Sequence, residues 1–227
     1  MKIYFIRHGH PDYKNDCLTE LGHRQAAAAA EKLKDSGIGQ IFSSTSGRAL
    51  QTAEHTARLL GLKVIPCKFM REISWNSTGG EPILADGNPW DLADIFASKG
   101  KTLTDAEWHK NEPYCKSKLI QSVQAVTEGV DSWLLSLGYQ REGEYYRVVG
   151  KETAKTVAMF SHGGSSTAAL SHILNIPFPQ LCGIVHLNYT SITVIEFSDK
   201  VGNLFCPRIR ILNDAKHIKG LDTIKKT

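Results

Sequence analysis

The sequence has few of the features that mark specialised classes of protein. Its 227 residues include five cysteines, an odd number, which are dispersed and never form a Cys-x-x-Cys pair. This pattern argues against a disulfide framework and a zinc site, and it suits a reducing compartment. No apolar run approaches the roughly 18 residues that a membrane-spanning helix needs, so we expect no membrane segment.

Other absences bear on partners and location. The formal net charge is only +4, and no block of lysines and arginines would form a patch for nucleic acid, whereas a small anionic substrate fits this mild excess. No basic segment followed by an apolar stretch precedes the first expected strand, so we expect no signal peptide and a cytoplasmic protein. Without repeats, low-complexity segments or a convincing linker, the chain is expected to form one domain over residues 1–227.

The most informative stretch lies at the N-terminus. Residues 2–6 have the branched, alternating apolar pattern of a short buried strand, and Arg7, His8 and Gly9 follow at its carboxyl end. Ligands bind at that end of the strands in open α/β sheets. A guanidinium offers paired donors to phosphate, glycine allows close backbone approach, and a neutral imidazole is a candidate nucleophile. Alone, the triplet is a weak signal, because a surface turn can carry the same residues.

The segments that follow alternate between helix and strand. Strands are expected at 40–44, 62–66, 156–160 and 191–197, with a further edge strand at 206–212. Helices are expected at 20–36 with Thr19 as N-cap, from about 48 to 60, at 117–137 and at 165–174, and a hairpin at 138–149. This alternation predicts an α/β fold with a mostly parallel sheet.

Residues 69–116 break the alternation. This stretch contains three of the four tryptophans and only short helical patterns. It is either an excursion over the sheet that shapes a pocket or an inert insertion packed at the side, and both interpretations stay open.

Two further strand ends carry polar groups like those of the first. The strand at 156–160 leads into Ser161, His162 and Gly163, and the strand at 40–44 leads into Ser44 and Arg48 at the start of a helix. A helix N-terminus favours a bound anion through its free N–H groups and its dipole. Two histidines, two arginines and a helix N-terminus at one edge of a sheet therefore indicate a phosphate-binding site.

This set of residues resembles the histidine phosphatase superfamily, also called the phosphoglycerate mutase-like family, in its phosphatase branch. The similar motifs, in chain order, are residues 7–9, 18–26, 43–54, 71–73, 161–164 and 212–217. The resemblance implies a three-layer α/β/α sandwich with a mostly parallel central sheet. It also implies one histidine phosphatase domain over residues 1–227, with residues 69–116 as a cap-like insertion.

The resemblance also implies roles for individual residues. His8 would attack phosphorus and form a phosphohistidine, Glu72 would protonate the leaving group, and His162 would complete the catalytic set. The residues implied to bind the substrate phosphate are Arg7, Gly9, Ser44, Arg48 and Gly163. No metal or other cofactor is expected, because the arginines supply the positive charge.

Two loops depart from the family pattern. Residues 74–81 differ from the stretch that usually follows the acid, which leaves Glu81 as a second candidate for that role. Residues 10–13 also differ from the usual loop after the nucleophile. Both loops would face the leaving group, so the phosphate chemistry is expected to be intact while the substrate stays open.

We therefore expect a phosphomonoesterase that hydrolyses a small phosphorylated metabolite, with a ribazole phosphate of the cobalamin pathway as one substrate to consider. The alternatives are phosphotransfer of the phosphoglycerate mutase type and a non-catalytic module that binds a phosphorylated ligand. We expect no nucleic-acid or membrane partner, and a homodimer is left open.

Overall fold

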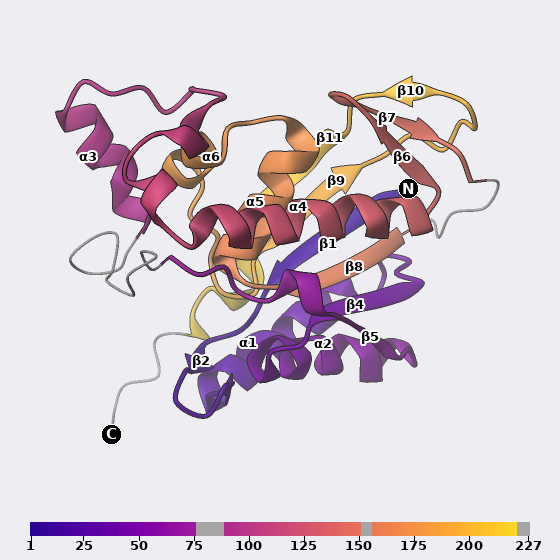
Figure 1. The fold of residues 1–227 in the computed structure, drawn as a ribbon. Helices are drawn as coiled ribbons and strands as arrows, with labels where there is room; N and C mark the ends of the chain where they lie inside the picture. The colour runs from indigo at the N-terminus through magenta and orange to yellow at the C-terminus, as the bar shows by residue number, and fades with distance from the viewer. Residues whose placement is uncertain (76–88, 151–155, 222–227) are drawn as a thin grey trace.

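A six-stranded sheet forms the centre of the computed structural model, which describes residues 1–75, 89–150 and 156–221 (Figure 1). The strand order is β11-β9-β1-β8-β4-β5. The strands are β1 (Lys2–Arg7), β4 (Gln40–Ser44), β5 (Val64–Cys67), β8 (Thr156–Ser161), β9 (Ile192–Glu196) and β11 (Arg208–Asp214). Strands β1, β8, β4 and β5 pair in parallel, and β9 runs antiparallel to both of its neighbours. The predicted mostly parallel sheet is confirmed.

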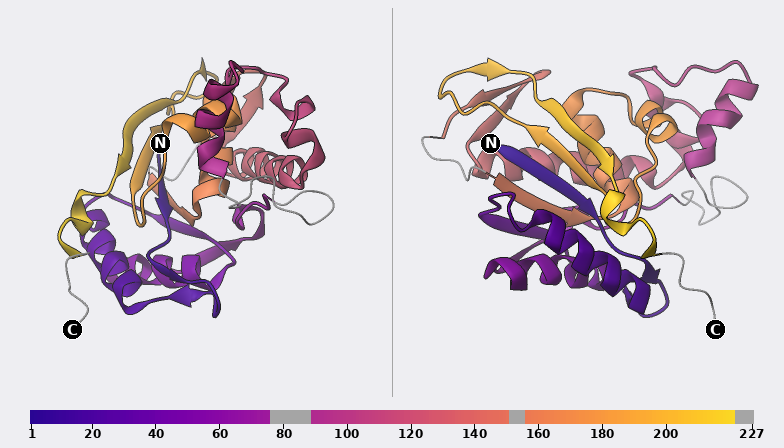
Figure 2. Two further views of the ribbon diagram at one scale, coloured as in Figure 1. Left: turned by 90° about the vertical axis from the view of Figure 1, so that its left-hand side faces the viewer. Right: turned by 180° about the vertical axis from the view of Figure 1, so that it is seen from behind.

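Helices cover both faces of this sheet. On one face lie α1 (Glu20–Leu33) and α2 (Gly47–Leu60), and on the other lie α4 (Leu119–Ser136) and α5 (Gly163–Leu174), as the views in Figure 2 also show. The arrangement is the expected three-layer α/β/α sandwich. It follows from parallel strands, whose crossover connections place helices on both faces.

The side chains of the central strands alternate between the two helical layers. Ile3 and Phe5 of β1 pack in the core shared with α4 and α5, whereas Ile6 packs in the core beside α1 and α2. Strand β8 repeats the pattern, with Val157 and Met159 on the first side and Ala158 and Phe160 on the second. The smaller core on the second side also contains Leu33, Ile41 and Ala53. Because both faces are buried, the strands read as apolar runs.

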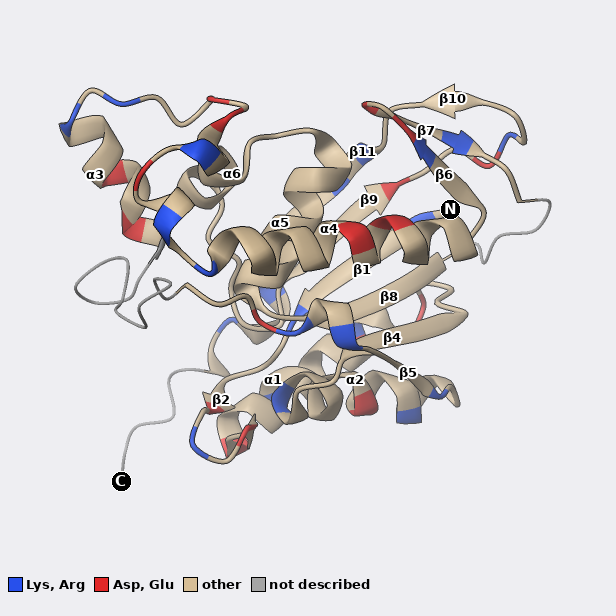
Figure 3. Ribbon diagram, viewed as in Figure 1, with Lys and Arg blue, Asp and Glu red and all other residues tan. Residues whose placement is uncertain are grey.

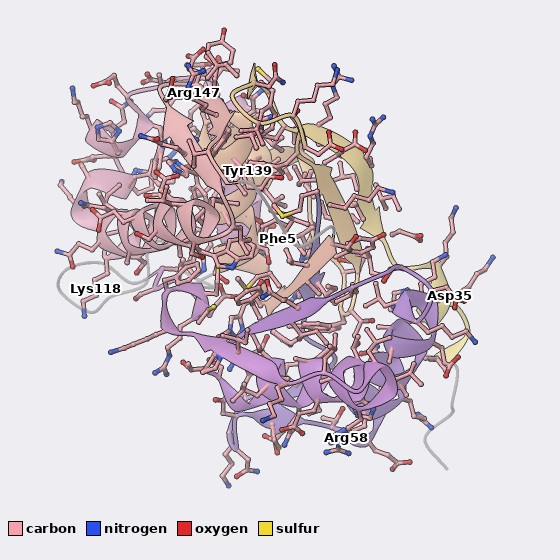
Figure 4. The ribbon with its side chains drawn as sticks, turned by 90° about the vertical axis from the view of Figure 1, so that its right-hand side faces the viewer. Phe5, Asp35, Arg58, Lys118, Tyr139 and Arg147 are labelled. Carbon is pink, nitrogen blue, oxygen red and sulfur yellow. The ribbon has the colours of Figure 1, made fainter. Side chains whose placement is uncertain are left out.

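Figure 4 shows this division between interior and surface. Phe5 is 2% exposed and lies between the layers, with its ring centroid 6.4 Å from that of Trp133, whereas Asp35, Arg58 and Lys118 lie at the periphery. Acidic and basic residues are interspersed over the elements of both helical layers in the view of Figure 3. None of the helices in the described part of the chain combines the length and the apolar character needed to cross a bilayer.

Local sequence signals explain where several helices begin and end. Thr19 is the N-cap of α1, as predicted, and its side-chain oxygen accepts a hydrogen bond of 3.1 Å from the Gly22 N–H. The helix ends at Leu33, three residues before the expected end. Helix α2 ends at Gly61, whose φ of 66° is the left-handed conformation that stops many helices.

Smaller elements flank the sandwich. A small sheet joins the predicted hairpin, β6 (Tyr139–Glu142) and β7 (Tyr145–Val148), to β10 (Leu204–Phe205), and β2 (Pro11–Asp12) pairs with β3 (Cys17–Leu18). Within 69–116 the described residues form α3 (Leu92–Ser98) and short 3-10 turns, and α3 packs against α6 (Phe178–Ile184). No sequence pattern predicted α6 or β10, which are short. The division of the chain into one domain with a cap-like insertion stays a prediction.

The first turn of α1 packs directly on the turn that follows β1. A Cβ atom added to Gly22 would lie 2.2 Å from the His10 carbonyl oxygen, and one added to Gly9 would lie 2.6 Å from the Gly22 carbonyl oxygen. Both contacts are with backbone, which cannot move aside as a flexible side chain could. These glycines therefore let the helix approach the turn that carries His8.

We expect Gly22→Ala to lower the free energy of unfolding by about 1–3 kcal/mol, because the added methyl group overpacks a backbone contact. Urea unfolding measures this value. Gly39→Ala is the matched control, since its nearest neighbour, the Thr156 carbonyl oxygen, lies 3.9 Å from the added Cβ. Equal stability of the two variants would show that the close approach of α1 is not required.

Candidate active site

The candidate site lies where three adjacent strands end. Strands β1, β8 and β4 are neighbours at the centre of the sheet, and their carboxyl ends lead into His8, His162 and Ser44 (Figure 1). The His8 N–H donates a hydrogen bond of 2.9 Å to the Ser161 carbonyl oxygen, which continues the ladder between β1 and β8. The topology thus brings together residues that are far apart in the sequence, as predicted.

His8 is buried and held in one tautomer. Its Nδ1 lies 2.7 Å from the Gly9 carbonyl oxygen, and because a carbonyl oxygen only accepts hydrogen bonds, Nδ1 must carry the proton. Nε2 then keeps its lone pair, and it accepts a hydrogen bond of 3.4 Å from Arg48 Nε. Burial lowers the pKa of His8 to about 3, and the nearby charges of Arg7 and Arg48 act in the same direction. The site therefore holds a neutral imidazole with an unprotonated Nε2.

His162 faces His8 across the site. The ring centroids are 5.2 Å apart, and His162 Nε2 lies 2.8 Å from the Ser44 hydroxyl oxygen. The Ser46 N–H donates to that same oxygen, at 3.3 Å. Burial, followed by the electrostatic interactions with His8 and with the charge of Arg48, holds the pKa of His162 well below its usual value. Its Nδ1 is buried and has no hydrogen-bond partner among the residues that the structure describes.

Asp16 fixes Arg48 at the edge of the site. One carboxylate oxygen of Asp16 accepts a hydrogen bond from Arg48 Nη1, and the other accepts one of 2.8 Å from the Gly47 N–H. Burial raises the pKa of Asp16, but these hydrogen bonds and the charge of Arg48 outweigh it and lower the pKa overall. Sequence reasoning missed Asp16. Its φ of 48° lies in the left-handed region, where Asp and Asn are enriched, but no sequence pattern shows that conformation.

Arg7 is held by a different segment. Its Nη1 donates a hydrogen bond of 2.5 Å to the Leu187 carbonyl oxygen, and its guanidinium carbon lies 4.4 Å from the centroid of the Tyr189 ring. Arg7 Nε is buried and has no hydrogen-bond partner within the described chain. Neither Leu187 nor Tyr189 was expected from the sequence, because both lie in an irregular loop.

Glu72 lies against the N-terminus of α5. Its Oε1 accepts hydrogen bonds from the Ile73 N–H at 3.0 Å and the Ser165 N–H at 2.9 Å, and its Oε2 accepts one of 3.3 Å from the Gly164 N–H. Although the residue is exposed, desolvation by the protein around its carboxyl group raises the pKa of Glu72. The three N–H donors and Arg7 oppose this shift without reversing it. A carboxyl group in this position is suited to carrying a proton.

The glycines of the site allow close packing. A Cβ on Gly163 would lie 3.6 Å from the Arg7 guanidinium carbon, and one on Gly164 would lie 2.8 Å from Glu72 Oε1. Gly9 uses its N–H to donate to Thr52 Oγ1 at 3.1 Å, and its carbonyl oxygen binds His8. Through these hydrogen bonds Gly9 helps to hold the His8 ring in position.

Glu81, the second candidate acid, lies outside the described residues. His10 contacts the N-cap of α1, where its Nδ1 lies 3.0 Å from Thr19 Oγ1. In the described part of the chain, no group of three or more His, Cys, Asp or Glu side chains is placed to hold a metal ion.

Comparison with models of known protein families shows the family of this chain. The model of the histidine phosphatase superfamily (branch 1) matches residues 3–206. The chain belongs to this superfamily. The match spans β1 to β10 and includes all of the histidines and arginines of the site.

The curated relatives of this chain include probable phosphoglycerate mutases. A probable phosphoglycerate mutase, GpmB of Yersinia pestis (strain Pestoides F), is 32% identical over 119 residues, which are 47% of this chain and 55% of that protein. The chain thus matches about half the length of this curated relative.

Solved structures show the same fold. The mycobacterial glucosyl-3-phosphoglycerate phosphatase has a TM-score of 0.64 at 23% identity, over 93% of this chain and 98% of that one. Phosphoserine phosphatase from Entamoeba histolytica has a TM-score of 0.62 at 22% identity, over 96% and 98% of the two chains.

We expect nitrogen NMR to find His8 neutral and protonated on Nδ1 between pH 8 and about pH 5, since its pKa lies well below this range. Labelled imidazole shifts distinguish the two tautomers and the protonated form, and His8→Gln assigns the signal. A proton on Nε2, or protonation of the ring within this range, would contradict the geometry described above.

Proposed function

We propose that this histidine phosphatase is a phosphomonoesterase that hydrolyses a small phosphorylated metabolite through a phosphohistidine on His8. The observation that carries the proposal is the fixed tautomer of His8. Nδ1 is tied to the Gly9 carbonyl oxygen, so the lone pair of the buried, neutral Nε2 is available to attack phosphorus.

Arg7, Arg48 and His162 are proposed to bind the oxygens of the transferring phosphoryl group. The two guanidinium groups supply fixed positive charge, which offsets charge in the transition state without a metal ion. The Ser44 hydroxyl supports the role of His162. It accepts from the Ser46 N–H and can donate its own hydrogen to Nε2. The proton of the neutral ring then lies on Nδ1, which has no hydrogen-bond partner among the described residues.

Glu72 is proposed as the general acid. In the first step Nε2 forms a bond to phosphorus, the ester P–O bond breaks, and the Glu72 proton passes to the leaving oxygen. The raised pKa of Glu72 supports this role, because a neutral carboxyl group can supply the proton that an alkoxide needs. In the second step the Glu72 carboxylate takes a proton from water, and the oxygen of that water attacks phosphorus. The P–N bond breaks, and inorganic phosphate and neutral His8 are restored.

The second candidate is phosphotransfer of the mutase type. The 32% identity to a probable phosphoglycerate mutase favours it, and the phosphate-handling residues would be the same. A mutase would keep the phosphohistidine and return the phosphoryl group to its substrate, whereas a phosphatase gives it to water. The fate of the phosphoenzyme therefore separates the two functions.

The direct test is release of inorganic phosphate from a panel of phosphorylated metabolites in the presence of a chelator. We expect activity that His8→Ala lowers at least about a thousandfold, as removal of a nucleophile usually does. His10→Ala is the matched control, since it removes a nearby histidine from the same loop. Turnover that persists in His8→Ala, or that needs added metal, would contradict the proposal. Interconversion of phosphoglycerates without net phosphate release would support the mutase instead.

The pH dependence of kcat/KM tests the role of Glu72. Because His8 has a lowered pKa, it stays unprotonated above about pH 4, and protonation of His8 should not limit activity in that range. Because Glu72 must be protonated and has a raised pKa, activity should fall as the pH rises through that value. Glu72→Gln should abolish this alkaline fall.

The leaving group provides the control for this prediction. An alkyl phosphate needs a proton on its leaving oxygen, and a p-nitrophenyl phosphate does not. We expect Glu72→Gln to lower kcat/KM roughly a hundredfold for the alkyl ester and much less for the aryl ester. Equal losses for both substrates would assign Glu72 a structural role at α5.

A further inference from the structure

The loop between α6 and β9 covers one side of the candidate site. Within it, the Tyr189 ring lies over the Arg7 guanidinium at 4.4 Å and beside His8, with ring centroids 5.8 Å apart. Tyr189 is half-buried. A guanidinium stacked on an aromatic face within about 6 Å is attracted to the ring and loses freedom to rotate.

The same loop holds Arg7 at a second point. The Leu187 carbonyl oxygen binds Nη1 at one end of the guanidinium, while Tyr189 covers one of its faces. The buried Nε has no hydrogen-bond partner in the part of the chain that the structure describes, so it stays available to donate. Two contacts from one loop thus fix the plane of the guanidinium and leave a donor for an anion.

The C-terminal part of the chain holds this loop in place. The Asn213 side chain accepts from the Asn188 N–H at 2.8 Å and donates to the His186 carbonyl oxygen at 2.8 Å. Thr190 has a φ of 51°, a left-handed conformation that is strained for a β-branched residue. Its N–H donates to the His8 carbonyl oxygen at 3.3 Å, and its hydroxyl lies 3.0 Å from His217 Nε2. Because Thr190 is held by both His8 and His217, the neighbouring residue Tyr189 has a defined position.

Arg48 shows the same arrangement in a looser form. Asp16 binds its guanidinium, and the ring of Tyr13 lies 5.4 Å from its guanidinium carbon. Tyr13 is 64% exposed, so its ring is less confined than that of Tyr189. Arg48 already has a carboxylate partner, whereas Arg7 has a neutral carbonyl oxygen and depends more on its aromatic neighbour.

We propose that Tyr189 is a positioning residue that holds the Arg7 guanidinium in the plane in which it binds a phosphate oxygen. The inference rests on the proposed function in one respect, that the anion bound at Arg7 is phosphate. Because Tyr189 acts through the Arg7 guanidinium, which binds phosphate, its loss should change the affinity for phosphate more than the rate of the chemical step.

The test compares Tyr189→Leu with Tyr189→Phe. Binding of inorganic phosphate is measured by titration calorimetry, and KM and kcat are measured with p-nitrophenyl phosphate. We expect Tyr189→Leu to weaken phosphate binding and raise KM about tenfold, with a smaller effect on kcat. A tenfold change lies between the effects of an exposed and of a desolvated cation–π contact, as suits a half-buried ring. Tyr189→Phe keeps the ring and should stay within about twofold of the unmodified protein.

A double-mutant cycle shows whether the effect passes through Arg7. Arg7→Lys removes the planar guanidinium, so Tyr189→Leu should have little further effect in that background. Tyr145→Leu, on strand β7 and 45% exposed, controls for loss of a tyrosine elsewhere. Urea unfolding checks that each variant folds, and Tyr189→Met replaces Tyr189→Leu if the latter does not.

Three results would overturn the inference: unchanged phosphate affinity in Tyr189→Leu, an equal loss in Tyr189→Phe, or a full tenfold loss in the Arg7→Lys background. A failure of the proposed function would give a different result, namely that His8→Ala leaves phosphate release unchanged. The calorimetric comparison of the Tyr189 variants would still test the role of Tyr189 in that case.

Discussion

The charge of the two arginines is the constraint on which the site depends. A guanidinium keeps its proton at any ordinary pH, so it cannot escape desolvation by becoming neutral, as a buried histidine does. Each arginine must therefore be compensated where it lies. Arg48 has the carboxylate of Asp16, and Arg7 has a carbonyl oxygen and an aromatic face. The histidines between them respond to the same charge and burial by staying neutral.

Glu72 is subject to opposite influences. Three backbone N–H groups and Arg7 favour its carboxylate, whereas desolvation favours the neutral acid and is the larger effect. A group balanced in this way can change its protonation state when a ligand alters its surroundings. The N-terminus of α5 supplies two of those N–H groups, so the helix that follows His162 also holds Glu72.

The sequence predicted those parts of the structure that depend on residues close together in the chain, such as strand patterns and helix caps. Strand β4 has the expected bounds because residues 40–44 are an uninterrupted strand pattern, and Thr19 caps α1 because its side chain can accept from Gly22. His8, His162 and Arg48 meet because parallel strands end at one edge. The supporting residues could not be predicted in this way. Asp16 and Tyr189 lie in irregular loops, and their partners depend on how distant segments pack.

The position of Asn213 has a consequence for synthesis. Arg7 and His8 leave the ribosome well before Asn213, the residue of β11 whose side chain holds the loop beside Arg7. Strand β11 joins the sheet at its edge, beside β9, after the core strands are made. A nascent chain therefore carries Arg7 and His8 long before the residue that holds the loop beside Arg7 has been made.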